Sequence, residues 1–209
     1  MHTEGVAHGP STLFLHTGAT NLIRPSVGSW VTYGLGTENQ NLPGFVTLQP
    51  SGSKGGPRNH SNAFLPAVFQ GTAIGKAGQP ASEATLRNAV NSSLPLKEQE
   101  RRFRLLQKLN AAQLASRPQD DQLEAVAESF ELAWRMQMNA PEVFDLAGED
   151  EPTKRLYGIG EKHTDDFGKQ CLMARRMAEA GVRYIQVNYA DESTNPRWDQ
   201  HSNMPKHMD

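Results

Sequence analysis

Two residues near the end of the 209-residue chain, Asp199 and His201, have the types and the spacing of metal ligands. They lie in the segment NPRWDQHSN at 195–203, and side chains at positions i and i+2 of an extended segment point to the same side. A carboxylate and an imidazole placed in this way can bind one divalent metal ion. A bound metal acidifies water or polarises an ester oxygen, so the pair indicates metal-assisted hydrolysis.

Asp199 and His201 are too few to hold a metal alone, since zinc takes about four ligands and magnesium about six. The candidate donors from the rest of the chain are His8 and His2, followed by His207 in the C-terminal tail. A polar surface loop without function is the alternative interpretation of the segment. Three further histidines have no comparable context and are predicted to be surface or helix-cap residues: His16, His60 and His163.

The elements that must position this pair are a helix and a strand between 164 and 189. Thr164 is predicted as the N-cap of the helix, Gly181 as the glycine that follows its end, and Val182 to Tyr189 as a strand. A helix, a glycine turn and a strand form half of a parallel α/β unit. Open α/β sheets place their active sites beyond the carboxyl ends of strands, which is where this pair would lie. The predicted apolar face of the helix consists of Phe167, Cys171, Ala174 and Ala178.

The remaining pattern predicts an α/β fold with a mostly parallel sheet flanked by helices. Residues 24–36 predict a helix with Ser26 as its N-cap, and 42–50 predict a strand between Pro and Gly residues. Residues 50–62 are rich in Gly, Ser and Asn and lack the phosphate-loop pattern, so they predict an ordinary loop. The apolar stripe of the first helix consists of Val27, Trp30, Val31 and Gly34.

A helical insertion is predicted at about 97–145. Pro118 divides it into an antiparallel pair of helices, and Asp120 or Asp121 can cap the second helix. The first helix has one predicted apolar face, formed by Leu105, Leu106, Leu109 and Leu114. The second has apolar residues at steps of three and four, which are Leu123, Val126, Ala127, Phe130, Trp134 and Met138.

Composition excludes several classes of function. Lys plus Arg is 21 and Asp plus Glu is 23, so the formal net charge of −2 gives no basis for nucleic-acid binding. Cys171 is the only cysteine, so neither an intramolecular disulfide nor a thiolate metal site can form. Its place on the apolar helical face predicts a small buried residue. No apolar stretch approaches the 18 residues of a membrane span, and no signal-peptide pattern is visible.

Several segments together resemble one bacterial family, domain of unknown function 1501. They are MHTEGVAHGPSTLFLHTG (1–18), RPSVGSWVTYGLGTENQNLPGFVTL (24–48), CLMARRMAEAGVRYIQV (171–187) and WDQHSN (198–203). This family is described as sulfatase-like and resembles the alkaline phosphatase and sulfatase superfamily. The resemblance implies that residues 1–209 are part of a single sulfatase-like domain, with an incomplete sheet.

The segment HGPSTLFLHTG (8–18) resembles the sulfatase pattern C-x-P-S-R, an apolar run and T-G. His8 stands where sulfatases have their nucleophilic Cys, and Thr12 where they have Arg, so a formylglycine cannot form here. The resemblance leaves His8 as a metal ligand or an imidazole nucleophile, and Ser11 as a second candidate catalytic residue. Asp199 and His201 look like the metal ligands, and the implied metal is zinc, calcium or manganese.

The resemblance implies a metal-dependent hydrolase of sulfate or phosphate esters, with a small-molecule or polysaccharide ester as substrate. It also implies an exported protein, periplasmic or extracellular, and further E-x-G-R and D-H-H segments downstream. On that expectation the chain is a fragment that is inactive alone. The alternative is a non-catalytic scaffold that binds a cell-surface ligand or partner, which the departures at His8 and Thr12 favour.

Overall fold

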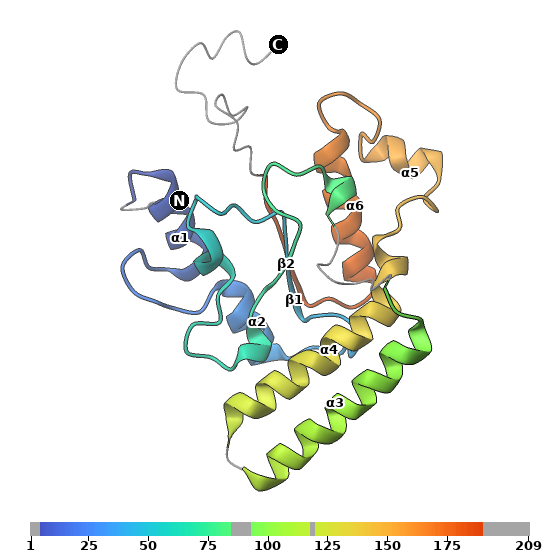
Figure 1. Cartoon of the computed structure of the whole chain (residues 1–209). Coiled ribbons are helices and arrows are strands. Elements are labelled where there is room, and N and C mark those ends of the chain that lie inside the picture. Colours follow the sequence, from blue (N-terminus) through green and yellow to red (C-terminus); the bar gives the residue numbers. More distant parts are fainter. Residues whose placement is uncertain (1–4, 85–92, 118–119, 190–209) are drawn as a thin grey trace.

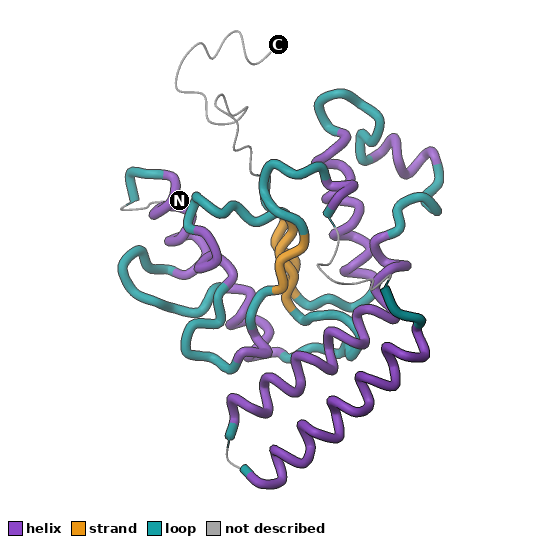
Figure 2. Tube along the Cα trace, in the orientation of Figure 1, coloured by secondary structure: helices purple, strands orange, loops and turns teal. Residues whose placement is uncertain are grey.

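The computed structural model has an α/β architecture and describes residues 5–84, 93–117 and 120–189. A short sheet stands between two groups of helices (Figure 1), and Figure 2 shows the same view by secondary structure. The helices are α1 (His8–Thr17), α2 (Val27–Leu35), α3 (Leu96–Ser116), α4 (Asp121–Phe144), α5 (Glu151–Leu156) and α6 (Asp165–Glu179). The strands are β1 (Phe45–Leu48), β2 (Thr72–Ile74) and β3 (Tyr184–Val187), and short 3-10 helices are η1 (Gly56–His60), η2 (Ala67–Phe69) and η3 (Ala81–Glu83).

The described strands form one parallel sheet in the order β2-β1-β3, so β1 is central. Val46 pairs with Thr72 on one side, and Phe45 pairs with Tyr184 on the other. The strands predicted at 42–50 and 182–189 are confirmed as β1 and β3, and so is the parallel sheet. The sequence does not predict β2, because three residues are too few to show a period of two.

The unit formed by α6 and β3 agrees with its predicted boundaries. Thr164 occupies the N-cap position of α6, and Gly181 follows the helix with a φ of 89°, a value that glycine adopts without steric cost. The backbone N–H of Val182 then donates to the carbonyl oxygen of Met177 at 2.9 Å, which closes the turn into β3.

The buried face of α6 differs from the predicted one. Leu172, Met173 and Met177 are almost fully buried, whereas Phe167 is 38% exposed and Cys171 is only partly buried. Burial of the longer Leu and Met side chains removes more apolar area from water, so the helix is rotated toward them. The main core cluster joins them to residues of the sheet and of α4: Leu42, Val46, Leu48, Ile74, Ala84, Met136 and Val182.

On the other face of the sheet, α2 also turns its apolar stripe away from the strands. Its buried residues are Gly28, Ser29 and Thr32, while Trp30 is 46% exposed. A Cβ atom added to Gly28 would lie 2.6 Å from the rings of Phe45 and Tyr184, so only glycine allows this close approach. The helix predicted at 24–36 is thus confirmed, and its predicted apolar face is the exposed one.

The antiparallel pair of helices predicted at about 97–145 is confirmed as α3 and α4 (Figure 1). Phe103 stacks on Trp134 with ring centroids 4.9 Å apart, and the side chain of Asp120 caps α4 by accepting a hydrogen bond from the N–H of Leu123 at 3.0 Å. No residue of α3 is buried, and Leu105 and Leu109 of its predicted apolar face are both more than half exposed. Only α4 reaches the core, through Met136.

The end of α4 is attached to α6 by charged groups. Arg176 donates to the carbonyl oxygens of Glu142 and Val143 at 2.6 and 3.0 Å, and thereby satisfies groups that have no partner within the helix. Arg175 and Arg176 both bind the carboxylate of Glu149, and these hydrogen bonds lower the pKa of Glu149. Among the helices of the described segments, none is long and apolar enough to cross a membrane.

Candidate functional site at the carboxyl edge of the sheet

The carboxyl ends of the parallel strands meet at one edge of the sheet, which we call the carboxyl edge. Gln49 follows β1, Gly75 follows β2 and Asn188 follows β3. Because strands in a parallel sheet all end on the same side, loops from distant parts of the sequence converge here. In Figure 1 this edge lies at the top of the sheet, whereas α3 and α4 lie near its lower end.

Gln49 has the most constrained backbone at the carboxyl edge. Its φ of 46° lies in the left-handed region, which costs a non-glycine residue on the order of 1–3 kcal/mol. It is 4% exposed, and its side-chain N–H donates to the carbonyl oxygen of Gln79 at 2.9 Å. Its side-chain oxygen accepts a hydrogen bond from Gln170 at 2.9 Å. Strained backbone of this kind is concentrated at functional sites, and together with the position at the strand ends it makes this edge the candidate site.

The first turns of α6 are tied to the loop after β2. One carboxylate oxygen of Asp166 accepts a hydrogen bond from the N–H of Ala81, and the other accepts one from Gln170 at 3.2 Å. The side-chain oxygen of Gln170 is buried and has no hydrogen-bond partner among the described residues. A chain of amide and carboxylate groups therefore joins β1, the loop after β2 and α6.

Asn188 controls how the chain leaves β3. Its side-chain N–H groups donate to the hydroxyl of Thr47 at 2.9 Å and to the carbonyl oxygen of Leu48 at 2.6 Å. Its side-chain oxygen accepts a hydrogen bond from Gln186 at 2.9 Å. These bonds hold the last described part of the chain against the end of β1.

Helix α1 brings the N-terminal candidates to the same edge. It packs against η1, and a Cβ atom added to Gly9 would lie 3.6 Å from the backbone nitrogen of Gly55, in the loop that follows β1. His8, an exposed residue, therefore lies in the first turn of a helix that contacts the carboxyl-edge loops. The hydroxyl of Ser11 donates to the carbonyl oxygen of Gly5 at 2.8 Å, so its proton is already engaged.

The other predicted ligands, Asp199 and His201, lie outside the described residues, as do His2 and His207. β3 ends at the carboxyl edge, so the segment that contains Asp199 and His201 continues from there. Within the described ranges no three His, Cys, Asp or Glu side chains converge as metal ligands. Of the predicted site residues, the described ranges include His8 and Ser11.

His60 was not recognised as a candidate from the sequence, which predicts a surface or helix-cap residue. It is in fact 7% exposed, at the end of η1, and its Nδ1 atom is enclosed and has no hydrogen-bond partner among the described residues. Burial lowers the pKa of His60, and the charge of the neighbouring His16 lowers it further. Burial also lowers the pKa of His16, on the adjacent α1. Both imidazoles are therefore held in the neutral form at neutral pH.

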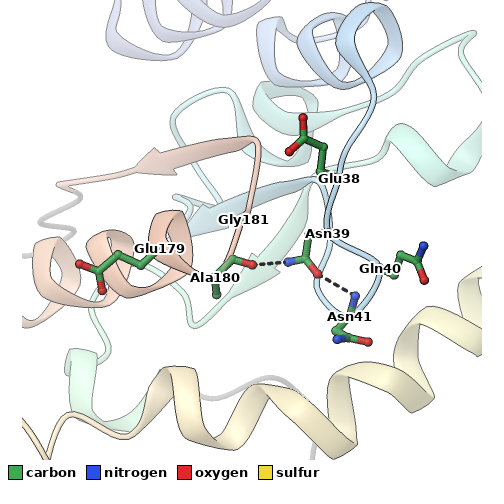
Figure 3. A pocket seen from close by; sticks show the side chains of 7 residues that line it. All are labelled: Glu38, Asn39, Gln40, Asn41, Glu179, Ala180 and Gly181. Atoms are coloured by element: carbon green, nitrogen blue, oxygen red, sulfur yellow. Dashed lines mark hydrogen bonds between the residues drawn. The ribbon is translucent and has the colours of Figure 1, made fainter.

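Two pockets lie at opposite edges of the sheet. The carboxyl-edge pocket, of about 400 Å³, is lined by Pro50, Ser51, Gly52, Pro57, His60, Ala73, Gly75, Lys76, Gln79 and Glu83. The amino-edge pocket, of about 430 Å³, is formed by residues 38–41 and 179–181 (Figure 3). There the side chain of Asn39 donates to the carbonyl oxygen of Ala180 at 2.8 Å and accepts from the N–H of Asn41 at 2.7 Å. The side chain of Asn39 thus provides hydrogen-bond partners for a carbonyl group at the end of α6 and for an N–H group of its own loop.

The chain matches the family described as protein of unknown function (DUF1501) over residues 1–209. No curated protein and no solved structure matches it.

Proposed function

The chain belongs to the DUF1501 family, and on that premise we propose that it forms part of a metal-dependent hydrolase of sulfate or phosphate esters. The observation that carries the proposal is that α1, with His8, packs against η1 and the loop after β1, at the edge of the sheet where β3 also ends. That edge also contains the strained, buried Gln49. Parallel α/β sheets bind their ligands at this edge.

In this proposal His8, Asp199 and His201 hold a divalent metal ion: zinc, calcium or manganese. When bound, such a metal polarises the ester oxygen and acidifies water. The described residues include only His8 of this set, so we derive no geometry for the metal and no reaction step through it. The described residues do fix the end of β3, the strand that precedes Asp199 and His201 in the sequence, through the hydrogen bonds of Asn188.

The test compares metal content and turnover of the chain with those of single variants. Zinc, calcium and manganese are quantified by mass spectrometry, and hydrolysis is followed with an aryl sulfate and an aryl phosphate. We expect Asp199→Ala and His201→Ala to lose bound metal and turnover. The matched control is His163→Ala, which removes an exposed imidazole before α6 and should behave like the parent chain. Equal metal content in all variants would contradict the proposal.

The role of His8 is resolved by the same measurements. Loss of metal in His8→Ala assigns it as a ligand, whereas loss of turnover with metal retained assigns it as a nucleophile. Ser11→Ala tests the second catalytic candidate. If the Ser11 hydroxyl only stabilises the chain through its bond to Gly5, this variant loses some stability and keeps its turnover per folded molecule.

A non-catalytic scaffold that binds a cell-surface ligand or partner is the second candidate function. It is favoured by the departures from the sulfatase pattern at His8 and Thr12 and by the engagement of the Ser11 hydroxyl with Gly5. A folded chain that contains no metal and turns over neither ester, and whose variants at Asp199 and His201 match the parent, supports this second function.

A further inference from the structure

The outer side of α2 carries exposed aromatic residues that the proposed hydrolysis does not use. Helix α2 packs on β1 and β3 through its buried side, with η1 and η2 beside it, and lies across the sheet from α6 (Figure 1). On its outer side Trp30, Tyr33 and Phe64 are 46%, 53% and 69% exposed. We call the following set of residues the aromatic face: Val27, Trp30, Tyr33, Phe64, Val68 and Phe69.

The rings of the aromatic face contact one another. Trp30 meets Phe64 edge to face with ring centroids 5.8 Å apart, and it meets Tyr33 at 6.0 Å. Tyr33 in turn meets Phe69 at 5.3 Å. These contacts fix the side chains before any partner binds, so association costs less side-chain entropy. Large aromatic residues in fixed positions are the ones that dominate binding at protein interfaces.

The apolar area of the aromatic face agrees with that of a dimer interface. A buried aromatic side chain removes roughly 150–250 Å² from water, so this set of half-exposed side chains offers roughly 500 Å². A standard interface buries about 800 Å² per partner, and homodimer interfaces are about 65% apolar, which corresponds to a similar apolar area. A contiguous apolar patch of this size on a protein surface is often functional.

The segments that form the aromatic face contain no charged residue. None occurs in α2 or in residues 61–75, although 21% of the whole chain is charged. In a two-fold dimer the residues near the axis meet their own copies, so a charge there would meet a like charge. An uncharged face avoids this repulsion. An anionic lipid surface instead attracts apolar segments that carry Lys or Arg, and these two segments carry neither.

Gly34 leaves room for a close approach to the aromatic face. It is exposed and lies one helical turn after Trp30, and a Cβ atom added to it would meet no other element within 4 Å. A glycine on the surface of a helix lets another chain come close to the backbone. The space beside Trp30 can therefore accept a large side chain.

We propose that the aromatic face binds a second copy of this chain. The α2 helices of the two copies pack against each other about a two-fold axis, and the Trp30 ring of each copy lies over Gly34 of the other. This dimer is independent of the proposed ester hydrolysis, so either proposal can fail while the other stands.

The test is sedimentation equilibrium of the whole chain at micromolar concentrations. We expect the mass to rise with concentration from the 23.0 kDa of one chain toward twice that value. Gly34→Glu places a carboxylate in open space on the monomer, but near a like charge in the dimer. It should raise the dissociation constant of the dimer by at least about tenfold. Trp30→Ser removes the central ring and should raise it by roughly tenfold.

The matched controls are Gly148→Glu and Leu156→Ser, which replace an exposed glycine and an exposed apolar residue outside the aromatic face. Both should associate as the parent does, and circular dichroism shows whether each variant has folded. A parent chain that stays monomeric overturns the proposal, and so do equal effects of Gly34→Glu and Gly148→Glu. Monomeric binding of the parent to phosphatidylglycerol vesicles, lost in Trp30→Ser, also overturns it and assigns the face to a lipid surface.

Discussion

The two edges of the sheet contain pockets of similar volume but differ in the backbone that surrounds them. At the amino edge, the side chain of Asn39 satisfies Ala180 at the end of α6 and the N–H groups of its own loop. At the carboxyl edge, Gln49 has a strained backbone, and its side chain joins the loop after β2 to α6 through Gln79 and Gln170. The amino edge is thus stabilised by one well-bonded amide, whereas the carboxyl edge keeps a costly backbone conformation of the kind that is concentrated at functional sites.

The largest effect on stability is expected at the amino edge. Asn39→Ala removes three hydrogen bonds, those with Ala180, Asn41 and Leu42, and should lower the free energy of unfolding by about 2 kcal/mol. Denaturant titration measures this change. The neighbouring exposed Gln40→Ala should change it by less than about 0.5 kcal/mol. An Asn39→Ala chain as stable as the Gln40 variant would show that the amino edge does not have this structural role.

A smaller loss of stability, with a functional consequence, is expected for Asn188→Ala at the carboxyl edge. It removes the bonds to Thr47 and Leu48 and should destabilise the chain by about 1–2 kcal/mol. Because Asn188 anchors the exit from β3, bound metal should also decrease in the proposed hydrolase. The metal content per folded molecule measures this effect. An unchanged metal content would show that the hydrogen bonds of Asn188 do not support the metal site.

Gln49 allows a test of backbone strain. Gln49→Ala and Gln49→Gly lose the same side-chain hydrogen bonds, but only glycine adopts a φ of 46° without cost. The glycine variant should therefore be more stable than the alanine variant by about 1 kcal/mol. At Gln40, where φ is not positive, alanine should be the more stable of the two. If thermal unfolding gave the same order of stability for the alanine and glycine variants at Gln49 and at Gln40, the backbone of Gln49 would not be strained.

The smallest effect is a pH dependence that arises from His60 and His16. Burial lowers the pKa of both in the folded state, so the unfolded chain binds more protons at pH values just below the ordinary pKa of 6.5. Stability should therefore fall as the pH is lowered through 6.5, and it should be fully present above that value. His60→Gln should flatten this slope in denaturant titrations between pH 7 and 5, and an unchanged slope would contradict the prediction.

Local signals in the sequence predicted most of the elements correctly. Gly181 separates α6 from β3, Pro118 lies between α3 and α4, and Asp120 is confirmed as the cap of α4. Helix α1 was missed, because Gly9 and Pro10 are weak helix formers and Pro10 is tolerated only in the first turn. The position of the candidate site at a strand end was also predictable, since it follows from the parallel α/β pattern.

The orientation of the helices was less predictable. In α2 and α6 the residues that pack on the sheet are Gly28, Ser29 and Thr32, and Leu172, Met173 and Met177, rather than the predicted stripes. A helical period shows which residues share a face, but several faces can be apolar, and the neighbouring element determines which is buried. The ring of Phe45 occupies the space that a side chain at position 28 would fill, and a local sequence pattern does not show this contact.

The sequence by itself determined the types, order and boundaries of most elements, because caps, glycine turns and proline breaks act over a few residues. It also determined the family, through motifs at 1–18, 24–48 and 171–203. Only the tertiary structure decided that His60 is buried beside a pocket and that Gln49 is strained. It also placed α1, with His8, against the loop that follows β1. These properties depend on contacts between residues far apart in the chain, which local propensity does not encode.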